Sequence, residues 1–178
     1  MEYNNQPKYL GKLLSAILFV VFVVILGMIA LTFIAPKNTT FEASRTLPYA
    51  MDSVWDASND LETYRISREN ITKFIIKDTA KPKWVEYYGN SDSIEVKTTH
   101  FKPNSYKYYI VLSRKYEQAI GVGMYLAPKG DSTQVVLKGK TVYQNVWARV
   151  YYTILSPNTV PDFEFFRLES VLKKKYNK

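Results

Sequence analysis

One apolar segment limits what this chain can fold into. From Leu13 to Pro36 the sequence carries no charged residue and is almost entirely apolar. At about 1.5 Å per residue, a helix of this length spans about 36 Å, enough to cross a bilayer core of about 30 Å with some tilt. A cleaved signal peptide has a shorter apolar region and small residues at its cleavage site, where this chain has Met28 and Phe33. We therefore expect an N-terminal flank at residues 1–12, a retained transmembrane anchor at residues 13–36 and a folded domain at residues 37–178.

The charged residues beside the span give a slight preference for its orientation. Lys8 and Lys12 precede the span, and Lys37 and Arg45 follow it. Because basic residues favour the cytoplasmic side, the α-amino group tips this even balance toward a cytoplasmic N-terminus. We therefore expect a single-pass membrane protein whose domain lies on the extracytoplasmic side. The sequence has no cysteine, which fits either side of the membrane.

The chain is basic, with a formal net charge of +8. Nucleic-acid binding would need a recognisable module as well as charge, and the sequence contains none, so we expect no nucleic-acid partner. Anionic lipid headgroups would attract such a domain by about 1 kcal/mol for each basic residue close to the bilayer. A solvated basic face that serves solubility is the alternative. The basic residues are spread along the chain apart from one terminal group, Lys173, Lys174, Lys175 and Lys178.

The first part of the domain combines one strand with two short helices. A strand at residues 39–47 ends before Pro48, and a second short helix or helical turn is expected within residues 60–70. The first helix lies between them and carries one apolar stripe, formed by Met51, Val54, Trp55 and Ser58.

The remainder is a run of strands that ends in a long helix. Turn residues separate strands expected at residues 71–78, 83–89, 93–101, 105–114, 119–127 and 132–143. The spacing is typical of an antiparallel meander with one solvated face. The terminal helix begins near Thr159, and one of its faces carries Phe165, Leu168, Leu172 and Tyr176.

Alternation along the strands predicts which side chains share a face. Three strands each have a set of side chains that we expect on one face. The sets are Ile94, Val96, Thr98 and His100 on the strand at residues 93–101, Tyr106, Tyr108, Ile110 and Leu112 on the strand at residues 105–114, and Val135, Leu137, Thr141 and Tyr143 on the last strand. On the last strand, Gln134, Lys138 and Lys140 take the opposite face.

Two groups of residues, one at each end of the domain, carry a family pattern. The first is Leu47, Pro48, Val54, Trp55, Asn59 and Asp60, and the second is Gly130, Thr133, Val135, Asn145 and Arg149. Together with the order of the elements, they resemble the START-like SRPBCC superfamily, in particular its polyketide cyclase-like branch in membrane-tethered form. The sequence departs from the pattern at Ala50, where relatives have proline, and it lacks the Trp-x-Pro that many relatives have after the second helix.

This resemblance implies an α+β, helix-grip fold. A curved antiparallel sheet of about six to seven strands would wrap around the long C-terminal helix, with two short helices after the first strand. An elongated cavity would lie between the sheet and the terminal helix. Relatives use such a cavity for lipids, quinones, hormones or polyketides, others bind partner proteins, and a minority are enzymes.

The residue types argue against several kinds of chemistry. His100 is the only histidine and there is no cysteine, so we expect neither a transition-metal site nor a cofactor, and we assign no catalytic residue. His100 could act as a general base if it faces a cavity, or it could be a hydrogen-bonded structural histidine. Glu86, between Trp84 and Tyr88, is either a second inward polar group or a solvated strand carboxylate.

Aromatic side chains are the candidates for lining a cavity, because small-molecule sites are mostly apolar with a few polar groups. The chain has 15 Tyr, 9 Phe and 3 Trp, which could equally be core and surface residues of a β-rich domain. The candidate ligand-binding residues are Tyr64, Trp84, His100, Tyr106, Tyr108 and Tyr125.

The apolar, aromatic segment at residues 145–157 is a candidate for contact with the membrane. Trp and Tyr favour the headgroup interface, and the short linker after Pro36 keeps the domain close to the bilayer. The segment either forms a cavity mouth that faces the membrane or packs against the sheet. Its candidate interface residues are Trp147, Arg149, Tyr151 and Tyr152, which Phe163 and Phe166 could join.

Three functions stay open at this point. The first is binding of an apolar ligand, a lipid or isoprenoid-like molecule, at the bilayer surface. The second is an accessory subunit whose partners are other membrane proteins. The third is a cyclase- or hydrolase-type enzyme. A wide apolar cavity would favour the first, a collapsed cavity with apolar patches outside the second, and polar side chains converging on the cavity floor the third.

Overall fold

The computed structural model describes residues 6–68, 70–89, 92–115, 117–152 and 158–176. The chain divides into two compact units, Met1–Pro36 and Lys37–Lys178. The first holds α1 (Gln6–Ile34), in which Leu10–Ile34 is long and apolar enough to cross a membrane, judged by length and composition. The helix begins earlier than the expected residue 13. It ends before Pro36, because the residue that precedes a proline disfavours helical backbone.

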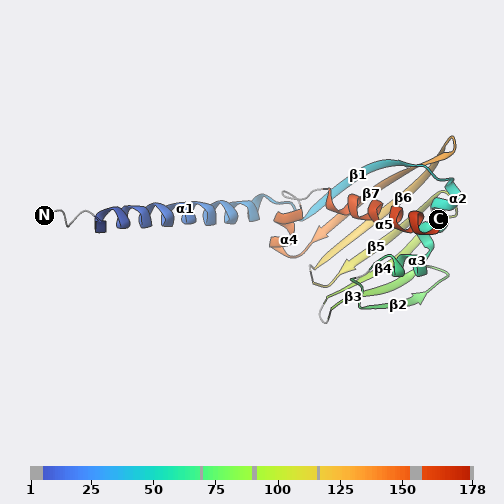
Figure 1. The fold of residues 1–178 in the computed structure, drawn as a ribbon, viewed down its shortest axis with the longest axis horizontal. Coiled ribbons are helices and arrows are strands. Elements are labelled where there is room, and N and C mark those ends of the chain that lie inside the picture. The colour runs from blue at the N-terminus through green and yellow to red at the C-terminus, as the bar shows by residue number, and fades with distance from the viewer. Residues whose placement is uncertain (1–5, 69, 90–91, 116, 153–157, 177–178) are drawn as a thin grey trace. The chain divides into compact units, whose positions relative to one another are not determined.

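The second unit contains one open, seven-stranded antiparallel sheet in the order β1-β7-β6-β5-β4-β3-β2 (Figure 1). Consecutive strands from β2 to β7 pair with their neighbours, and β1 pairs with β7. The strands are β1 (Asn38–Leu47), β2 (Lys73–Asp78), β3 (Lys83–Tyr88), β4 (Asp92–Lys102), β5 (Tyr106–Ser113), β6 (Gln118–Lys129) and β7 (Ser132–Tyr143). The sequence thus predicted every strand of this sheet to within a few residues.

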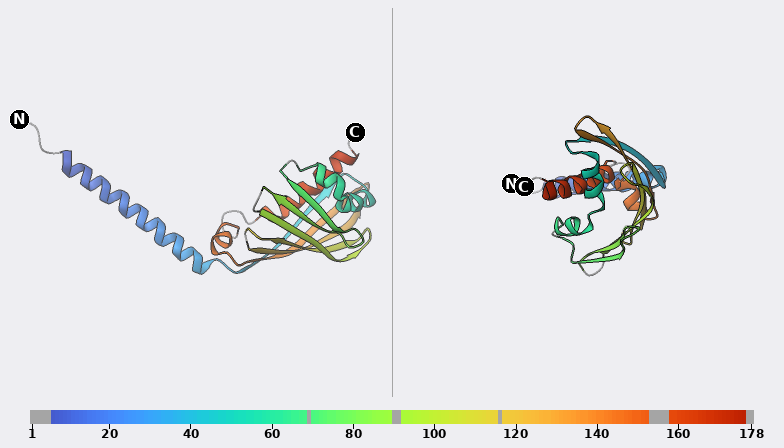
Figure 2. Two further views of the ribbon diagram at one scale, coloured as in Figure 1. Left: turned by 90° about the horizontal axis from the view of Figure 1, so that it is seen from below. Right: turned by 90° about the vertical axis from the view of Figure 1, so that its right-hand side faces the viewer.

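The helices of this unit lie on the concave side of the sheet. They are α2 (Met51–Asn59), α3 (Leu61–Ile66), α4 (Val146–Val150) and α5 (Thr159–Tyr176). The right-hand view of Figure 2 shows the sheet as an arc with α5, α2 and α3 inside it. Asp60 begins α3 by accepting a hydrogen bond from the backbone N–H of Thr63 at 2.9 Å, which satisfies a free donor of the first turn.

The core fills the space between the arc and α5. Val54 of α2, Val122 of β6, Val135 of β7 and Leu172 of α5 are completely buried there. The stripe predicted on the terminal helix is confirmed at Phe165, Leu168 and Leu172, whereas Tyr176 is exposed at the helix end and contacts the Tyr49 ring.

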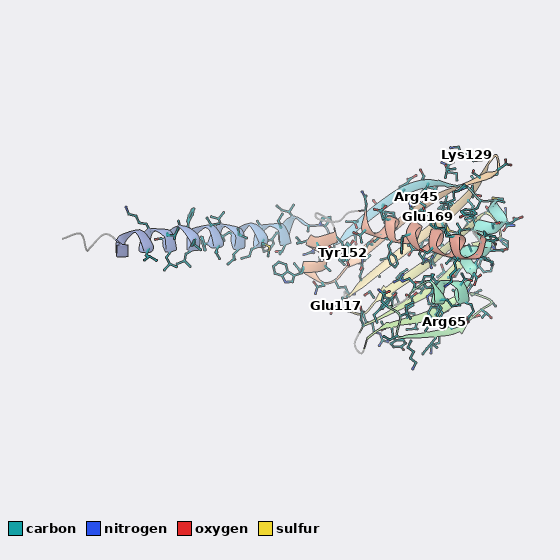
Figure 3. The ribbon with its side chains drawn as sticks, viewed as in Figure 1. Arg45, Arg65, Glu117, Lys129, Tyr152 and Glu169 are labelled. Carbon is teal, nitrogen blue, oxygen red and sulfur yellow. The ribbon has the colours of Figure 1, made fainter. Side chains whose placement is uncertain are left out.

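Ion pairs add contacts at the edge of this core. Arg45 of β1 binds Glu169 of α5 with a nitrogen–oxygen distance of 2.7 Å, and its guanidinium lies 4.6 Å from the centre of the Phe165 ring (Figure 3). The terminal helix is therefore held against β1 by charge as well as by apolar packing.

Alternation predicts β7 correctly, but β4 changes face within its length. Val135, Leu137, Thr141 and Tyr143 are buried on the inner face of β7. On β4, Val96 and Thr98 point inward as expected, but the register shifts between Thr98 and His100, so Thr98 pairs with Tyr109 and His100 with Tyr108. A β-bulge inserts one residue and turns the following side chains to the opposite face, which places His100 outside.

A polar interior between the sheet and the terminal helix

The space between the sheet and α5 holds a cluster of buried charged and hydroxyl groups among the apolar core. Its sheet residues, which face inward, are Glu86 of β3 and Lys107 and Tyr109 of β5. Tyr64 of α3 and Glu164 and Arg167 of α5 face them. We call these six residues the interior polar cluster.

Glu86 accepts hydrogen bonds from three aromatic side chains. Its Oε1 receives the Tyr64 hydroxyl at 2.8 Å and the Trp84 indole N–H at 2.6 Å, and its Oε2 receives the Tyr88 hydroxyl. Trp84, Glu86 and Tyr88 lie two residues apart on β3, so strand alternation brings them to one face. Burial, followed by the negative charge of Glu86, raises the pKa of both Tyr64 and Tyr88, so both hydroxyls stay protonated donors.

Arg68 brings a positive charge near Glu86, to which it is connected through two tyrosine hydroxyls. Its guanidinium donates to the Tyr88 hydroxyl at 2.9 Å and to the Tyr64 hydroxyl at 3.4 Å. Each tyrosine therefore connects Arg68 with Glu86, and the carboxylate is compensated without a direct ion pair.

The other charged residues that face the sheet, Glu164 and Arg167, lie about one helical turn apart on α5. Arg167 binds Glu164 with a nitrogen–oxygen distance of 2.9 Å, and the Tyr109 hydroxyl also donates to Glu164. Burial alone would lower the pKa of Arg167, but the interactions with Glu164, Tyr109, Tyr64 and Glu86 together outweigh it and the pKa is raised. The guanidinium carbon lies 5.3 Å from the centre of the Tyr64 ring and 5.5 Å from that of Tyr109, so aromatic faces enclose the cation.

Lys107 is buried on the inner face of β5, toward α2. Its ammonium group donates to the backbone carbonyl of Ser58 and lies 3.5 Å from the Asn59 side-chain oxygen. Burial, followed by the positive charge of Arg167, lowers the pKa of Lys107 well below the ordinary value of 10.5.

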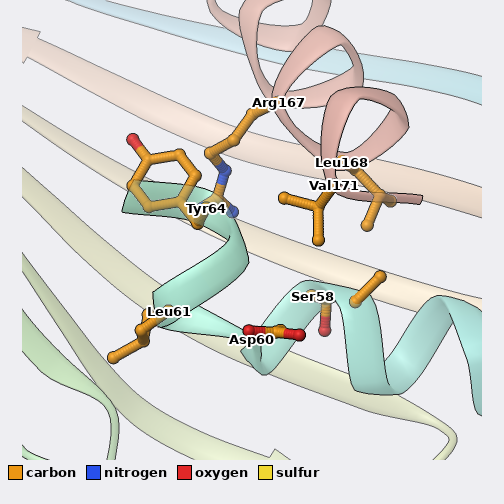
Figure 4. A pocket seen from close by; sticks show the side chains of 8 residues that line it. Ser58, Asp60, Leu61, Tyr64, Arg167, Leu168 and Val171 are labelled. Atoms are coloured by element: carbon orange, nitrogen blue, oxygen red, sulfur yellow. The ribbon is translucent and has the colours of Figure 1, made fainter. Parts of the chain in front are cut away.

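Two small cavities adjoin the cluster. One of about 30 Å³ is lined by inner-face residues of β3, β4 and β5 together with Phe163, Glu164 and Arg167. The other, of about 10 Å³, lies between α2, α3 and α5 (Figure 4). Tyr64 and Arg167 line both cavities, so these two adjacent side chains form the partition between them.

One polar atom in this partition has no partner. Among the residues that the structure describes, the buried Nε of Arg167 finds no hydrogen-bond acceptor. Such an orphan donor is unusual, because buried polar groups in proteins nearly all have partners.

The structure separates the predicted ligand-binding residues into two groups. Tyr64 and Trp84 lie in the interior, next to Glu86. His100, Tyr106, Tyr108 and Tyr125 lie on the outer face, where the three tyrosines are 36%, 38% and 45% exposed. The position of these side chains on the outer face differs from our expectation for two reasons. The bulge turns His100 outward, and on β5 the inner set is the one that contains Lys107 and Tyr109. Whether any of the six binds a ligand stays a prediction.

Four residues of the cluster were not predicted from the sequence: Lys107, Tyr109, Glu164 and Arg167. A signal was present on the terminal helix, since Glu164 and Arg167 directly precede Phe165 and Leu168 of its apolar stripe. A charged pair at i and i+3 beside such a stripe could have marked a buried ion pair. No comparable signal exists for Lys107, because a lysine between tyrosines on a strand is ordinarily a solvated residue.

The predicted membrane-interface residues lie on and after α4. The Asn145 side chain begins this helix by accepting from the backbone N–H groups of Trp147 and Ala148 at 2.9 and 3.0 Å. Trp147 and Tyr151 are 57% and 50% exposed, whereas Arg149 and Tyr152 are partly buried, and Tyr152 stacks on Tyr143. Residues 153–157 of the predicted segment lie outside the described residues.

We expect the Glu164→Gln substitution to be strongly destabilising. It removes the charge that compensates Arg167, and leaving one ion of a buried pair alone costs about 3–5 kcal/mol of unfolding free energy. Urea unfolding of the full chain in mild detergent, followed by tryptophan fluorescence, measures the loss. The control is Glu62→Gln in the exposed pair with Arg65, which should cost about 0–1 kcal/mol. Equal effects of the two substitutions would contradict a buried pair.

Lys107 should make stability depend on pH. Because its pKa is lowered in the folded state, the unfolded chain binds more protons at this site up to the ordinary value of 10.5, and the free energy of unfolding rises with pH in this window. The wild-type chain should therefore gain stability relative to Lys107→Met as the pH rises toward 10.5. Urea unfolding at several pH values measures this difference, and parallel curves for the two chains would contradict the prediction.

Within the described residues, no group of three or more His, Cys, Asp or Glu side chains is arranged to hold a metal ion. No protein-family model matches the sequence, and no curated protein matches it either.

Solved structures do resemble the chain. The protein Ara h 8.0201 superposes with a TM-score of 0.65 at 11% identity, covering 79% of this chain and 99% of its own. The Zhui aromatase/cyclase from Streptomyces sp. R1128 gives 0.58 at 16% identity, with 77% and 93% covered. A norcoclaurine synthase from Thalictrum flavum gives 0.58 at 8% identity, with 78% and 96% covered. At these identities the similarity concerns the fold. The structural neighbours are SRPBCC-like helix-grip proteins, and residues 37–178 have the helix-grip fold.

Proposed function

We propose that the domain at residues 37–178 binds an apolar molecule, a lipid or isoprenoid-like compound, between the sheet and α5, and that α1 holds the domain at a membrane. The observation that carries this proposal is the interior polar cluster. Two of its side chains, Tyr64 and Arg167, lie between the two small cavities and line both of them.

The composition of the interior supports a binding role. Burying an ion costs several kcal/mol, and apolar side chains of similar volume would leave the fold as stable or more so. Charged groups with perturbed pKa values inside a concave fold are candidates for a functional site. The larger cavity, which is mostly apolar with a few polar groups, matches the usual chemistry of small-molecule sites.

Both cavities are small, which is the arrangement expected above for a partner-binding subunit, so ligand binding requires side chains to move. Each has room for about one water molecule. Moving Tyr64 and Arg167 would join them into one elongated space along α5. Phe163, which lines the larger cavity, is 40% exposed, and its ring lies 4.8 Å from the Arg68 guanidinium. We infer that a ligand reaches the interior by displacing this ring.

Two neighbouring residues on β5 provide the test of ligand binding. Val111 lines the larger cavity, and Leu112 points to the outer face. Val111→Phe should fill the space and remove the bound molecule, whereas Leu112→Phe should keep it. Native mass spectrometry of the full chain extracted in mild detergent measures the added mass. The same bound mass in both variants, or none in the wild-type chain, would contradict binding in the interior.

The end of the domain that carries α4 fits the proposed contact with the bilayer. The backbone carbonyl of Lys37 accepts from the N–H of Tyr143 at 3.0 Å, so the chain enters the domain beside the strand end that leads into α4. Only residues 35–37 separate α1 from β1, which allows a span of about 10 Å. Exposed Trp147 and Tyr151 would then reach the headgroup region that aromatic residues favour.

Tryptophan quenching tests this contact in the full chain. After reconstitution with brominated phosphatidylcholine, part of the tryptophan emission should be quenched, because Trp147 lies at the interface. Trp147→Phe should abolish most of the quenching, and Trp55→Phe, at a partly buried position of α2, should retain it. Quenching that persists in Trp147→Phe would contradict contact through α4.

A second candidate function is contact with another membrane protein. It is favoured by the apolar side chains on the outer face of the sheet, among them Tyr106, Tyr125, Leu112 and Val142. Leu112 and Val142 border a broad open depression of about 580 Å³. The same mass spectra would show a bound protein with an empty interior in this case. For enzymatic chemistry, His100 and Glu86 lie on opposite faces of the sheet and cannot act as a pair.

A further inference from the structure

We infer that the interior selects an uncharged ligand whose polar end is a hydrogen-bond acceptor oxygen, a hydroxyl or a carbonyl, and that Arg167 Nε binds this oxygen. The inference rests on the proposed function and names the class of molecule that the interior would take.

Three of the four carboxylate oxygens of the cluster already accept hydrogen bonds or bind a charged partner. Both oxygens of Glu86 receive hydroxyl or indole donors, and Oε2 of Glu164 receives the Arg167 guanidinium and the Tyr109 hydroxyl. A ligand that offers only donors, such as an amine, would have to displace one of these contacts or bind Oε1 of Glu164, and neither choice would satisfy Arg167 Nε. Breaking a buried hydrogen bond costs the desolvation of the group left behind, about 1–3 kcal/mol.

The donor left over is Arg167 Nε. It is buried and has no acceptor among the described residues, and the Arg167 side chain, which is 10% exposed, lines both cavities. An acceptor oxygen that reached it would satisfy this buried donor. Hydrogen bonds to charged donors are about twice as strong as neutral ones.

The charges around the cavities are balanced without a ligand. Glu164 pairs with Arg167, and Glu86 is compensated by Arg68 through the Tyr64 and Tyr88 hydroxyls. Lys107 lines neither cavity and donates toward α2. A carboxylate or phosphate would add an uncompensated negative charge in a buried space, and an ammonium group would add a positive charge beside Arg167. Both are costly, whereas a neutral oxygen is not.

Photoreactive probes that have the same alkyl length but different end groups test this selectivity. They are added to the full chain in phosphatidylcholine nanodiscs. The probes share a saturated chain with a diazirine at its centre and end in a hydroxyl, a carboxylate, an ammonium or a methyl group. Peptide mass spectrometry locates the label. The hydroxyl probe should label the inner face of β3–β5 and α5 with a half-saturating concentration about tenfold lower than that of the methyl probe. The two charged probes should label these positions more weakly than the hydroxyl probe.

A conservative variant isolates the role of the Nε donor. Arg167→Lys keeps the positive charge beside Glu164 but removes the N–H at this position, so the hydroxyl probe should lose its tenfold advantage over the methyl probe. Arg65→Lys, in the exposed pair with Glu62, is the matched control and should retain the advantage. Thermal unfolding of each variant shows whether it is folded, and the comparison of the four probes on the wild-type chain does not depend on any variant.

The outcomes separate the inference from the proposed function. If a charged probe labels the interior as tightly as the hydroxyl probe, or if folded Arg167→Lys keeps the hydroxyl preference, the inference is overturned while ligand binding stands. If none of the four probes labels the interior of the wild-type chain, and native mass spectra show no bound molecule, the proposed function fails with it.

Discussion

The buried ion pair between Glu164 and Arg167 constrains how the terminal helix packs against the sheet. A guanidinium group stays protonated at any ordinary pH, so it can be buried only with a partner charge and enclosing side chains. Glu164 supplies the charge from the preceding turn of α5, Tyr109 extends the contact to β5, and Tyr64 encloses the guanidinium from α3. The rotation of α5 is therefore set by a polar constraint as well as by its apolar stripe.

The same constraint explains how small cavities can be compatible with a binding role. Arg167 and Tyr64 line both cavities and divide the remaining space, and they are held there by their packing on each other, by the hydrogen bond of Tyr64 to Glu86 and by the ion pair of Arg167 with Glu164. A ligand would have to offset the cost of moving them. An oxygen that satisfies Arg167 Nε offers part of this compensation, which an apolar chain alone does not.

Much of the fold follows from local sequence patterns, because these patterns report local physics. The strand boundaries follow from turn residues, the apolar stripe of α5 from helical periodicity, and the inner face of β7 from strict alternation. The candidate site was predictable only in part. Tyr64 and Trp84 were named and lie beside Glu86, but His100 was assigned to the wrong face of β4 because a one-residue bulge reverses the alternation.

The sequence by itself determined the apolar N-terminal helix and the order of the elements, since each depends on patterns repeated along a continuous segment, and the resemblance to a known family implied the helix-grip fold. Only the tertiary structure decided which face of β5 is buried and which polar groups meet inside. Alternation says that Tyr106 and Tyr108 share a face and that Lys107 and Tyr109 share the other, but it does not say which face is inside. That choice depends on partners distant in the sequence, because Lys107 is buried against the Ser58 carbonyl and Tyr109 against Glu164. A buried polar group is stable only where such partners meet it, and their meeting is a property of the whole fold.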